Sequence, residues 1–195
     1  REWFYRALTR RNGGFTTAAP PPQDFLRAYT LMAAEGTEIV MGIFTAGSVS
    51  SICNHARIAA RACNQVRVHV IDSCQISMGT GWLVICAAEL LAGGASVAQV
   101  LDALKEIRQR TLVLGMLNSL DYLQRSGRIG RVTRYMADFM RIKPLIAFEQ
   151  GEAQLLSRVR TYGRAIERLV ERVAERQPFM RLALLHSRVR DDTIA

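Results

Sequence analysis

The stretch EIVMGIFTAGSVSSICNHARIAARACNQVRVHVID, residues 38–72, holds the pattern that decides the fold. Two short, nearly all-apolar runs, EIVMGIF and VRVHVID, flank a helical segment, SVSSICNHARIAARACN. Apolar runs of this kind are expected for strands that are covered on both faces. Short apolar strands that alternate with longer helices are typical of parallel strands joined by right-handed crossovers. The stretch therefore predicts α/β architecture, with an open, mainly parallel sheet and flanking helices.

The same alternation extends in both directions along the chain. Before the stretch, an amphipathic helix runs from the first residue to the turn at residues 12–14, and a second helix follows the prolines and ends at Gly36. After it come the helices WLVICAAELLAGG and SVAQVLDALKEIRQR, and then a strand, TLVLGML. We therefore expect an N-terminal α/β domain over residues 1–113, lacking its first strand region.

A second, smaller α/β domain is expected over residues 114–195, cut short at its C-terminus. Its predicted elements include a helix SLDYLQRSG, a basic loop-helix RIGRVTRYMADFM and a strand KPLIAF. A Gly151 turn, the segment AQLLSRV, a long helix YGRAIERLVERVAER and a final strand MRLALLH complete the pattern.

Composition indicates a globular cytoplasmic protein. Of the residues, 49% are hydrophobic, yet the sequence contains no uninterrupted apolar run of the roughly 18 to 20 residues that a bilayer span requires, and its first residues do not resemble a signal peptide. The four cysteines show no CxxC spacing and are interpreted as reduced thiols. The three histidines are far apart and lack partners at metal-ligand spacing, so we expect no metal and no other cofactor.

The formal net charge of +9 raises the alternative of a basic regulatory protein that binds nucleic acid. Two of the 26 basic residues are Lys, which leaves 26 − 2 = 24 Arg, and this bias is consistent with genome base composition. Much of the excess lies between Arg125 and Arg141. We therefore do not expect nucleic-acid binding.

Two loops that follow predicted strands are candidate binding sites, because ligands of open α/β sheets gather at the carboxyl ends of strands. The loop TAGSVSS, residues 45–51, is rich in hydroxyls and opens a helix, although an ordinary serine N-cap explains it as well. The loop DSCQISMGTG, residues 72–81, combines small residues with the adaptable Met78, although tight helix packing explains its glycines equally well.

A third candidate is the loop in which Thr16 and Thr17 precede three prolines, residues 20–22. Proline fixes its own backbone and biases its predecessor toward extended conformations, so this loop is expected to be stiff and its hydroxyls pre-positioned. A polyproline linker or surface ligand is the alternative. The sequence contains no GxSxG elbow and no evident carboxylate pair, so we predict a binding protein without catalytic residues.

Three motifs, TTAAPPPQDF, DSCQISMGTGWLV and LDYLQRSGRIG, in this order resemble those of the DegV family of bacterial fatty-acid-binding proteins. The resemblance covers nearly the whole chain. It implies a carrier that holds a long-chain fatty acid in an apolar tunnel between two α/β domains, with the carboxylate exposed for phosphorylation by a fatty acid kinase. The chain would then belong to phospholipid metabolism and present substrate to a separate enzyme.

The resemblance also assigns residues. Thr17 matches the family's carboxylate-binding threonine. The family's serine-rich loop corresponds to residues 46–51, where the serine pair becomes Ala46-Gly47, leaving Ser48 or Thr45 as substitutes beside Gly47. In the second motif, residues 77–79 (Ser77, Met78 and Gly79) are assigned to the acyl-chain pocket.

The basic run is interpreted in two ways. Arg128, Arg131 and Arg134 recur at intervals of three, which suits a solvated helix face or a surface that docks the kinase or, transiently, an anionic membrane. The alternative function for the whole chain is a phosphotransferase or hydrolase subunit whose catalytic residues lie elsewhere.

Overall fold

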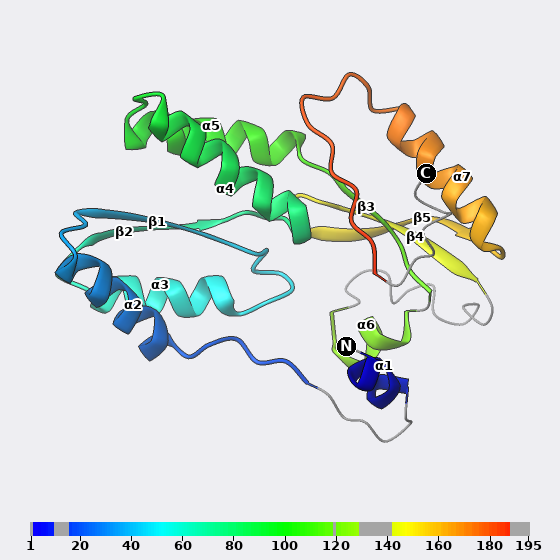
Figure 1. Cartoon of the computed structure of the whole chain (residues 1–195), viewed down its shortest axis with the longest axis horizontal. Helices are drawn as coiled ribbons and strands as arrows, with labels where there is room; N and C mark the ends of the chain where they lie inside the picture. The colour runs from blue at the N-terminus through cyan, green and yellow to red at the C-terminus, as the bar shows by residue number, and fades with distance from the viewer. Residues whose placement is uncertain (1, 10–15, 119, 129–141, 188–195) are drawn as a thin grey trace.

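A computed structural model describes residues 2–9, 16–118, 120–128 and 142–187. These residues form two α/β lobes side by side (Figure 1), one built on a two-stranded sheet and the other on a three-stranded sheet. The α/β fold class predicted from the sequence is confirmed.

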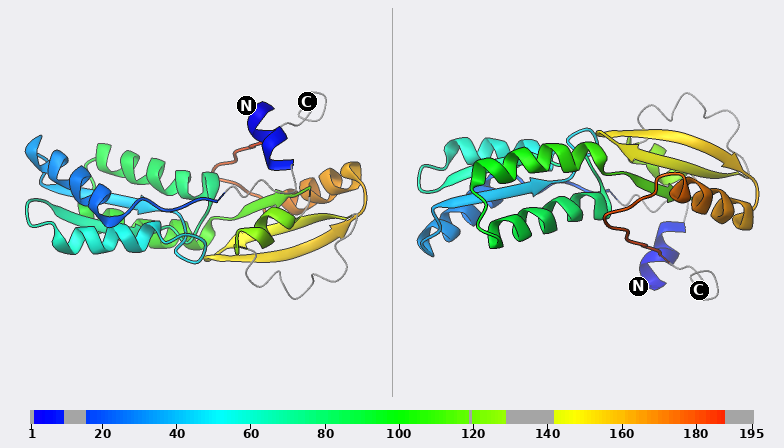
Figure 2. Two further views of the ribbon diagram at one scale, coloured as in Figure 1. Left: turned by 90° about the horizontal axis from the view of Figure 1, so that it is seen from below. Right: turned by 90° about the horizontal axis from the view of Figure 1, so that it is seen from above.

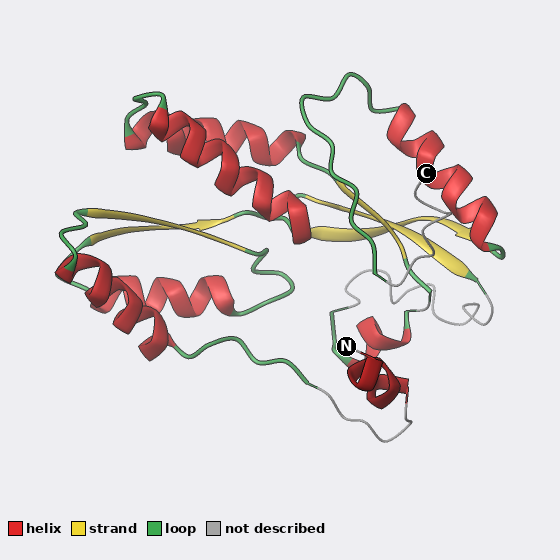
Figure 3. Ribbon diagram, in the orientation of Figure 1, coloured by secondary structure: helices red, strands yellow, loops and turns green. Residues whose placement is uncertain are grey.

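The first lobe consists of a parallel pair of strands between two layers of helices (Figure 3). Strand β1 pairs in register with β2, from Ile39 opposite Arg67 to Phe44 opposite Asp72. Its elements, in chain order, are α2 (Pro22–Ala34), β1 (Ile39–Phe44), α3 (Ile52–Ala62), β2 (Arg67–Asp72), α4 (Ser77–Ala92) and α5 (Val97–Arg110).

Alternation along β1 and β2 explains why both faces of this sheet are covered. Val40 and Val68 pack against the cluster that contains Tyr29 of α2 and Ala59 of α3. Residues one position further along, Met41 among them, point to the opposite face and pack against a cluster from α4 and α5. The prediction of strands covered on both faces is therefore confirmed.

The second lobe has an antiparallel sheet in the order β3-β4-β5, with α7 packed on one face (Figure 2). Its elements are β3 (Val113–Met116), α6 (Asp121–Arg125), β4 (Lys143–Glu149), β5 (Glu152–Val159) and α7 (Tyr162–Ala174). The N-terminal helix α1 (Glu2–Thr9) lies apart from the first lobe (Figures 1 and 2).

Two sequence-based expectations are wrong in this lobe. The strand TLVLGML does not extend the parallel sheet, because β3 pairs antiparallel with β4, with Val113 opposite Phe148. The predicted final strand MRLALLH is not a strand in the described chain, and it runs as an exposed, extended segment after α7. Arg181 holds this segment to α4 through two hydrogen bonds to Glu89, of 3.0 and 2.6 Å, and lies 5.7 Å from the ring centroid of Trp82.

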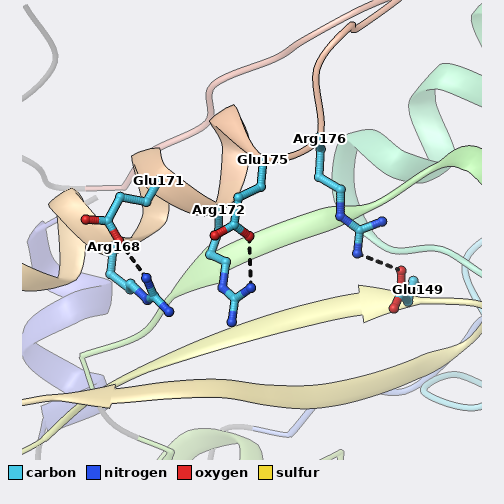
Figure 4. A network of polar contacts seen from close by, with 6 residues as sticks. All are labelled: Glu149, Arg168, Glu171, Arg172, Glu175 and Arg176. Carbon is cyan, nitrogen blue, oxygen red and sulfur yellow. Dashed lines mark hydrogen bonds and ion pairs between the residues drawn. The ribbon is translucent and has the colours of Figure 1, made fainter.

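Several charged side chains of α7 and of the residues just after it form ion pairs (Figure 4). The pairs are Arg168–Glu171 at 2.6 Å, Arg172–Glu175 at 2.9 Å and Arg176–Glu149 at 4.0 Å. Exposed pairs of this kind contribute little to stability, because solvent screens them.

Candidate functional site

The carboxylate of Asp72, at the end of β2, ties together the two loops that leave the parallel strands. Its Oδ2 accepts the backbone N–H of Gly47 at 3.0 Å, and its Oδ1 accepts the N–H of Cys74 at 2.8 Å. A Cβ on Gly47 would lie 2.8 Å from Oδ2, closer than real Cβ contacts allow. A side chain at position 47 would therefore force the Asp72 carboxylate to shift, and glycine lets the N–H of residue 47 donate to it in this geometry.

Ser48 contacts the second lobe. Its hydroxyl donates to the carbonyl of Gly151, and the N–H of Gly151 donates to the carbonyl of Cys74 at 2.8 Å. Gly151 and Gln150 form the β4–β5 turn with φ of 84° and 51°, the left-handed backbone that tight hairpin turns require. The hairpin tip thus lies against the loops after β1 and β2.

A pocket of about 580 Å³ opens beside these contacts, at the junction of the two lobes. It lies at the carboxyl ends of the parallel strands and at the N-terminus of α3, where open α/β sheets bind ligands. Its volume falls in the usual range for small-molecule sites. Its walls are mostly polar and comprise residues 47–51, Cys53, Asn54, Arg57, Asp72 and residues 126–128.

Two guanidinium groups give the pocket its cationic character. Arg57 comes from α3, and Arg128 follows α6 in the other lobe. Arg128 is fixed across the lobe junction, because its Nε donates to the carbonyl of Val49 at 3.2 Å and its Nη1 to that of Ser126 at 2.6 Å. The Asp72 carboxylate also lines the pocket, but its two oxygens accept the N–H groups of Gly47 and Cys74. The two arginines outnumber this one carboxylate, and the positive end of the α3 dipole adds to their charge, so the pocket favours an anion.

Two thiols near the pocket are uncharged at neutral pH. Burial raises the pKa of Cys53, a shift that Arg57 opposes in part. Burial also raises the pKa of Cys74, and the nearby Asp72 carboxylate adds to that shift. Neither group therefore adds negative charge that would repel an anionic ligand.

The structure brings together two of the four residues assigned to carboxylate binding. Gly47 and Ser48 line the pocket, whereas Thr45 and Thr17 are not among its lining residues. Thr17 is exposed, in an extended segment that α3 holds in place: His55 Nδ1 lies 2.8 Å from the carbonyl of Pro20. Since a carbonyl only accepts, Nδ1 carries the proton in this contact. The role of Thr17 stays a prediction.

The residues assigned to the acyl-chain pocket, Ser77, Met78 and Gly79, lie in the first turn of α4 rather than in a loop. Ser77 is exposed and Met78 half-buried, while Gly79 is buried where a Cβ would lie 2.8 Å from Val113 Cγ2. None of the three lines the pocket. Their contact with an acyl chain stays a prediction.

Of the three arginines assigned to docking, Arg128 belongs to the pocket wall, and Arg131 and Arg134 lie outside the described residues. The sequence-based analysis missed Arg57. Its spacing of four from Cys53 places both on one side of α3, and Arg57 Nη2 lies 3.5 Å from Cys53 Sγ. The position of Arg57 on the helix that follows the serine-rich loop was the feature of the sequence that could have identified it.

In the part of the chain that the structure describes, no three His, Cys, Asp or Glu side chains gather as metal ligands. No helix in the same described ranges has the length and apolar character that a bilayer span requires.

Fold and site together define a class: a two-lobed α/β protein with a polar pocket, lined by an arginine from each lobe, at the junction of its lobes. The chain belongs to the DegV family, because the family profile described as "Uncharacterised protein, DegV family" matches residues 1–194.

Relatives and solved structures agree with this assignment. A DegV domain-containing protein of Streptomyces coelicolor, SCO2569, is 32% identical over 171 residues, which are 88% of this chain and 60% of that protein. A DegV domain-containing protein of Deinococcus radiodurans is 32% identical over 158 residues, which are 81% of this chain and 56% of that protein. The chain thus spans about 60% of the length of the first of these relatives.

A DegV family protein from Thermus thermophilus, described as binding fatty acid, superposes with a TM-score of 0.80 at 30% identity, over 90% of this chain and 61% of that one. A DegV lipid-binding protein from Thermotoga maritima superposes with a TM-score of 0.76 at 25% identity, over 91% of this chain and 62% of that one. A stearic-acid-binding protein from Eubacterium ventriosum shares the fold, with a TM-score of 0.81 at 20% identity over 90% and 61%.

Proposed function

We propose that this chain is the binding portion of a fatty-acid carrier, and that the pocket at the lobe junction takes the carboxylate of a long-chain fatty acid. The observation that carries the proposal is that Arg57 of one lobe and Arg128 of the other both line that pocket, beside the N-terminus of α3. The fatty-acid binding described for the Thermus thermophilus relative supports the choice of ligand.

The head group is held by charge and by hydrogen bonds. Each hydrogen bond to a charged group contributes about 1.5–3 kcal/mol, and a helix N-terminus adds about 0.3–1 kcal/mol. Arg128 suits this role because two carbonyls fix its guanidinium and it therefore loses little side-chain entropy on binding. These contacts determine which end of the ligand lies in the pocket.

The tail supplies most of the affinity, since burying a methylene is worth about 0.8 kcal/mol. A C16 chain therefore gains about 11 kcal/mol gross, before the costs of ordering ligand and protein. Apolar side chains lie close in sequence to residues at the lobe junction. Leu123 of α6 precedes the pocket-lining Ser126, and Leu155 of β5 follows Gly151 of the turn. They pack with Leu120, so a tail leaving the pocket between α6 and β5 would meet apolar surface.

In this proposal the protein is not itself an enzyme. It presents the carboxylate to a fatty acid kinase in the cytoplasm, as part of phospholipid metabolism, and collects or releases acyl chains at membrane surfaces. The open mouth of a polar head-group pocket supports this, because a phosphoryl donor needs access to the carboxylate. Arg131 and Arg134 stay the proposed docking residues for the kinase.

Native mass spectrometry of the delipidated protein tests the proposal with two ligands of equal length, palmitate and hexadecanol. We expect palmitate to bind at least about tenfold more tightly, because the alcohol lacks the charge that the two arginines recognise. Binding of neither ligand, or equal binding of both, would overturn the proposed function. Release of a chemically altered acid without a kinase present would favour an enzyme instead.

A further inference from the structure

The β4–β5 turn is the feature of the second lobe that reaches the predicted carboxylate-binding loop. Gly151 accepts from the Ser48 hydroxyl of that loop and donates to the carbonyl of Cys74, in the loop after β2, at 2.8 Å. The two bonds join residues far apart in sequence, 103 positions in the case of Ser48. The turn therefore joins the hairpin of the second lobe to both loops that leave the parallel strands of the first lobe.

A serine hydroxyl has one proton to donate. In the structure Ser48 donates it to the Gly151 carbonyl, although the same side chain lines the pocket. A carboxylate only accepts, so Ser48 cannot hold the Gly151 carbonyl and donate to a bound carboxylate at the same time. The two acceptors compete for a single proton.

We propose that the β4–β5 turn is a ligand-sensitive latch: an acyl carboxylate entering the pocket takes the Ser48 hydroxyl and releases the carbonyl of Gly151. This inference rests on the proposed function and adds a regulatory property to the same site. The carboxylate wins the competition because hydrogen bonds to ionised acceptors are roughly twice as strong as those between neutral groups. Arg57 and Arg128, which would attract that charge, line the same pocket as Ser48.

The release is local. Arg128 still bonds to the carbonyl of Val49 across the junction, and Gly151 still donates to Cys74. One hydrogen bond in place of two then holds the turn against the first lobe. The backbone amide of Gly151 is therefore exposed to solvent more often. A partner that contacts the turn would distinguish the loaded carrier from the empty one.

Hydrogen exchange of the Gly151 amide, followed by NMR, tests the latch first without ligand. Ser48→Ala removes the hydroxyl from an exposed position and should leave the fold intact. We expect about two- to tenfold faster exchange at Gly151, the range given by one neutral hydrogen bond. The matched control is Ser51→Ala, a pocket-lining hydroxyl that makes no cap hydrogen bond to α3, and it should leave this amide unchanged. An unchanged rate in Ser48→Ala would overturn the latch.

The second measurement adds palmitate, with occupancy read by native mass spectrometry on the same sample. In the wild-type protein, exchange at Gly151 should rise to about the rate of ligand-free Ser48→Ala, and palmitate should add no further increase in that variant. Bound palmitate with an unchanged or slower Gly151 amide would overturn the inference and leave the carrier proposal standing. Absence of bound palmitate would instead overturn the carrier proposal itself.

Discussion

Replacing Gly47 by alanine tests whether the Asp72 carboxylate organises the pocket loops. The new Cβ would lie 2.8 Å from Asp72 Oδ2, the atom that accepts the N–H of residue 47 at 3.0 Å. Either the backbone at residue 47 or the Asp72 carboxylate must move. The carboxylate then loses its hydrogen bond to the N–H of residue 47 and keeps the one to Cys74. Such a bond is worth about 1.5–3 kcal/mol, and the half-buried position of Asp72 favours the lower end, about 1.5 kcal/mol. For a chain of this size that lowers the melting temperature by about 3–6 °C.

Thermal denaturation followed by circular dichroism measures the shift. The matched control is Gly163→Ala in the first turn of α7, where an added Cβ meets no atom within 4 Å and alanine is the better helix former. We expect no loss of stability in the control. In an Asp72→Ala background, the further cost of Gly47→Ala should fall toward zero. A Gly47→Ala protein as stable as wild type, or an equal cost in both backgrounds, would refute the reasoning.

Arg128→Gln should weaken palmitate binding about 10- to 100-fold by titration calorimetry, the cost of one charged hydrogen bond, whereas the exposed Arg125→Gln should change it little. Thr17→Ala should leave the melting temperature unchanged, since Thr17 is exposed. If Thr17 binds the carboxylate, this variant should retain the fatty acid several-fold more weakly in mass spectrometry. Full retention would exclude that role. Because burial raises the pKa of Cys53, the unfolded chain loses this proton first, so stability should fall as the pH rises above about 8.5. Urea titrations from pH 7 to 10 check this, and a slope unaffected by Cys53→Ala would count against it.

The first lobe follows directly from the sequence because its pattern is local. The apolar runs at residues 38–44 and 66–71 are covered on both faces, and the intervening segment has a helical period. Strands and crossover are therefore both specified within about 35 residues. The partner of β3 was not specified in this way. A four-residue apolar run is compatible with either sheet, and contacts with β4, about 30 residues later, determine its antiparallel pairing.

The site was predicted only in part, because its loop has a local pattern but its contacts join residues far apart in sequence. The loop after β1 was identified from its hydroxyls and its place in the α/β pattern, and Gly47 and Ser48 do line the pocket. Their hydrogen-bond partners could not be read from the sequence, because Asp72 is 25 residues away from Gly47 and Gly151 is 103 from Ser48. The same holds for Arg128, which reaches the pocket by crossing to Val49, 79 residues earlier.

The central claim is that a fatty carboxylate lies between Arg57 and Arg128. Palmitate labelled with ¹³C at its carboxyl carbon reports this directly, because the chemical shift of that carbon follows ionisation as the pH is lowered. Nearby cations favour the ionised form, so the bound carboxyl should titrate below the ordinary range of carboxylic acids, and its midpoint should rise in Arg128→Gln. A bound carboxyl that titrates in the ordinary range, or with the same midpoint in wild type and variant, would contradict the account.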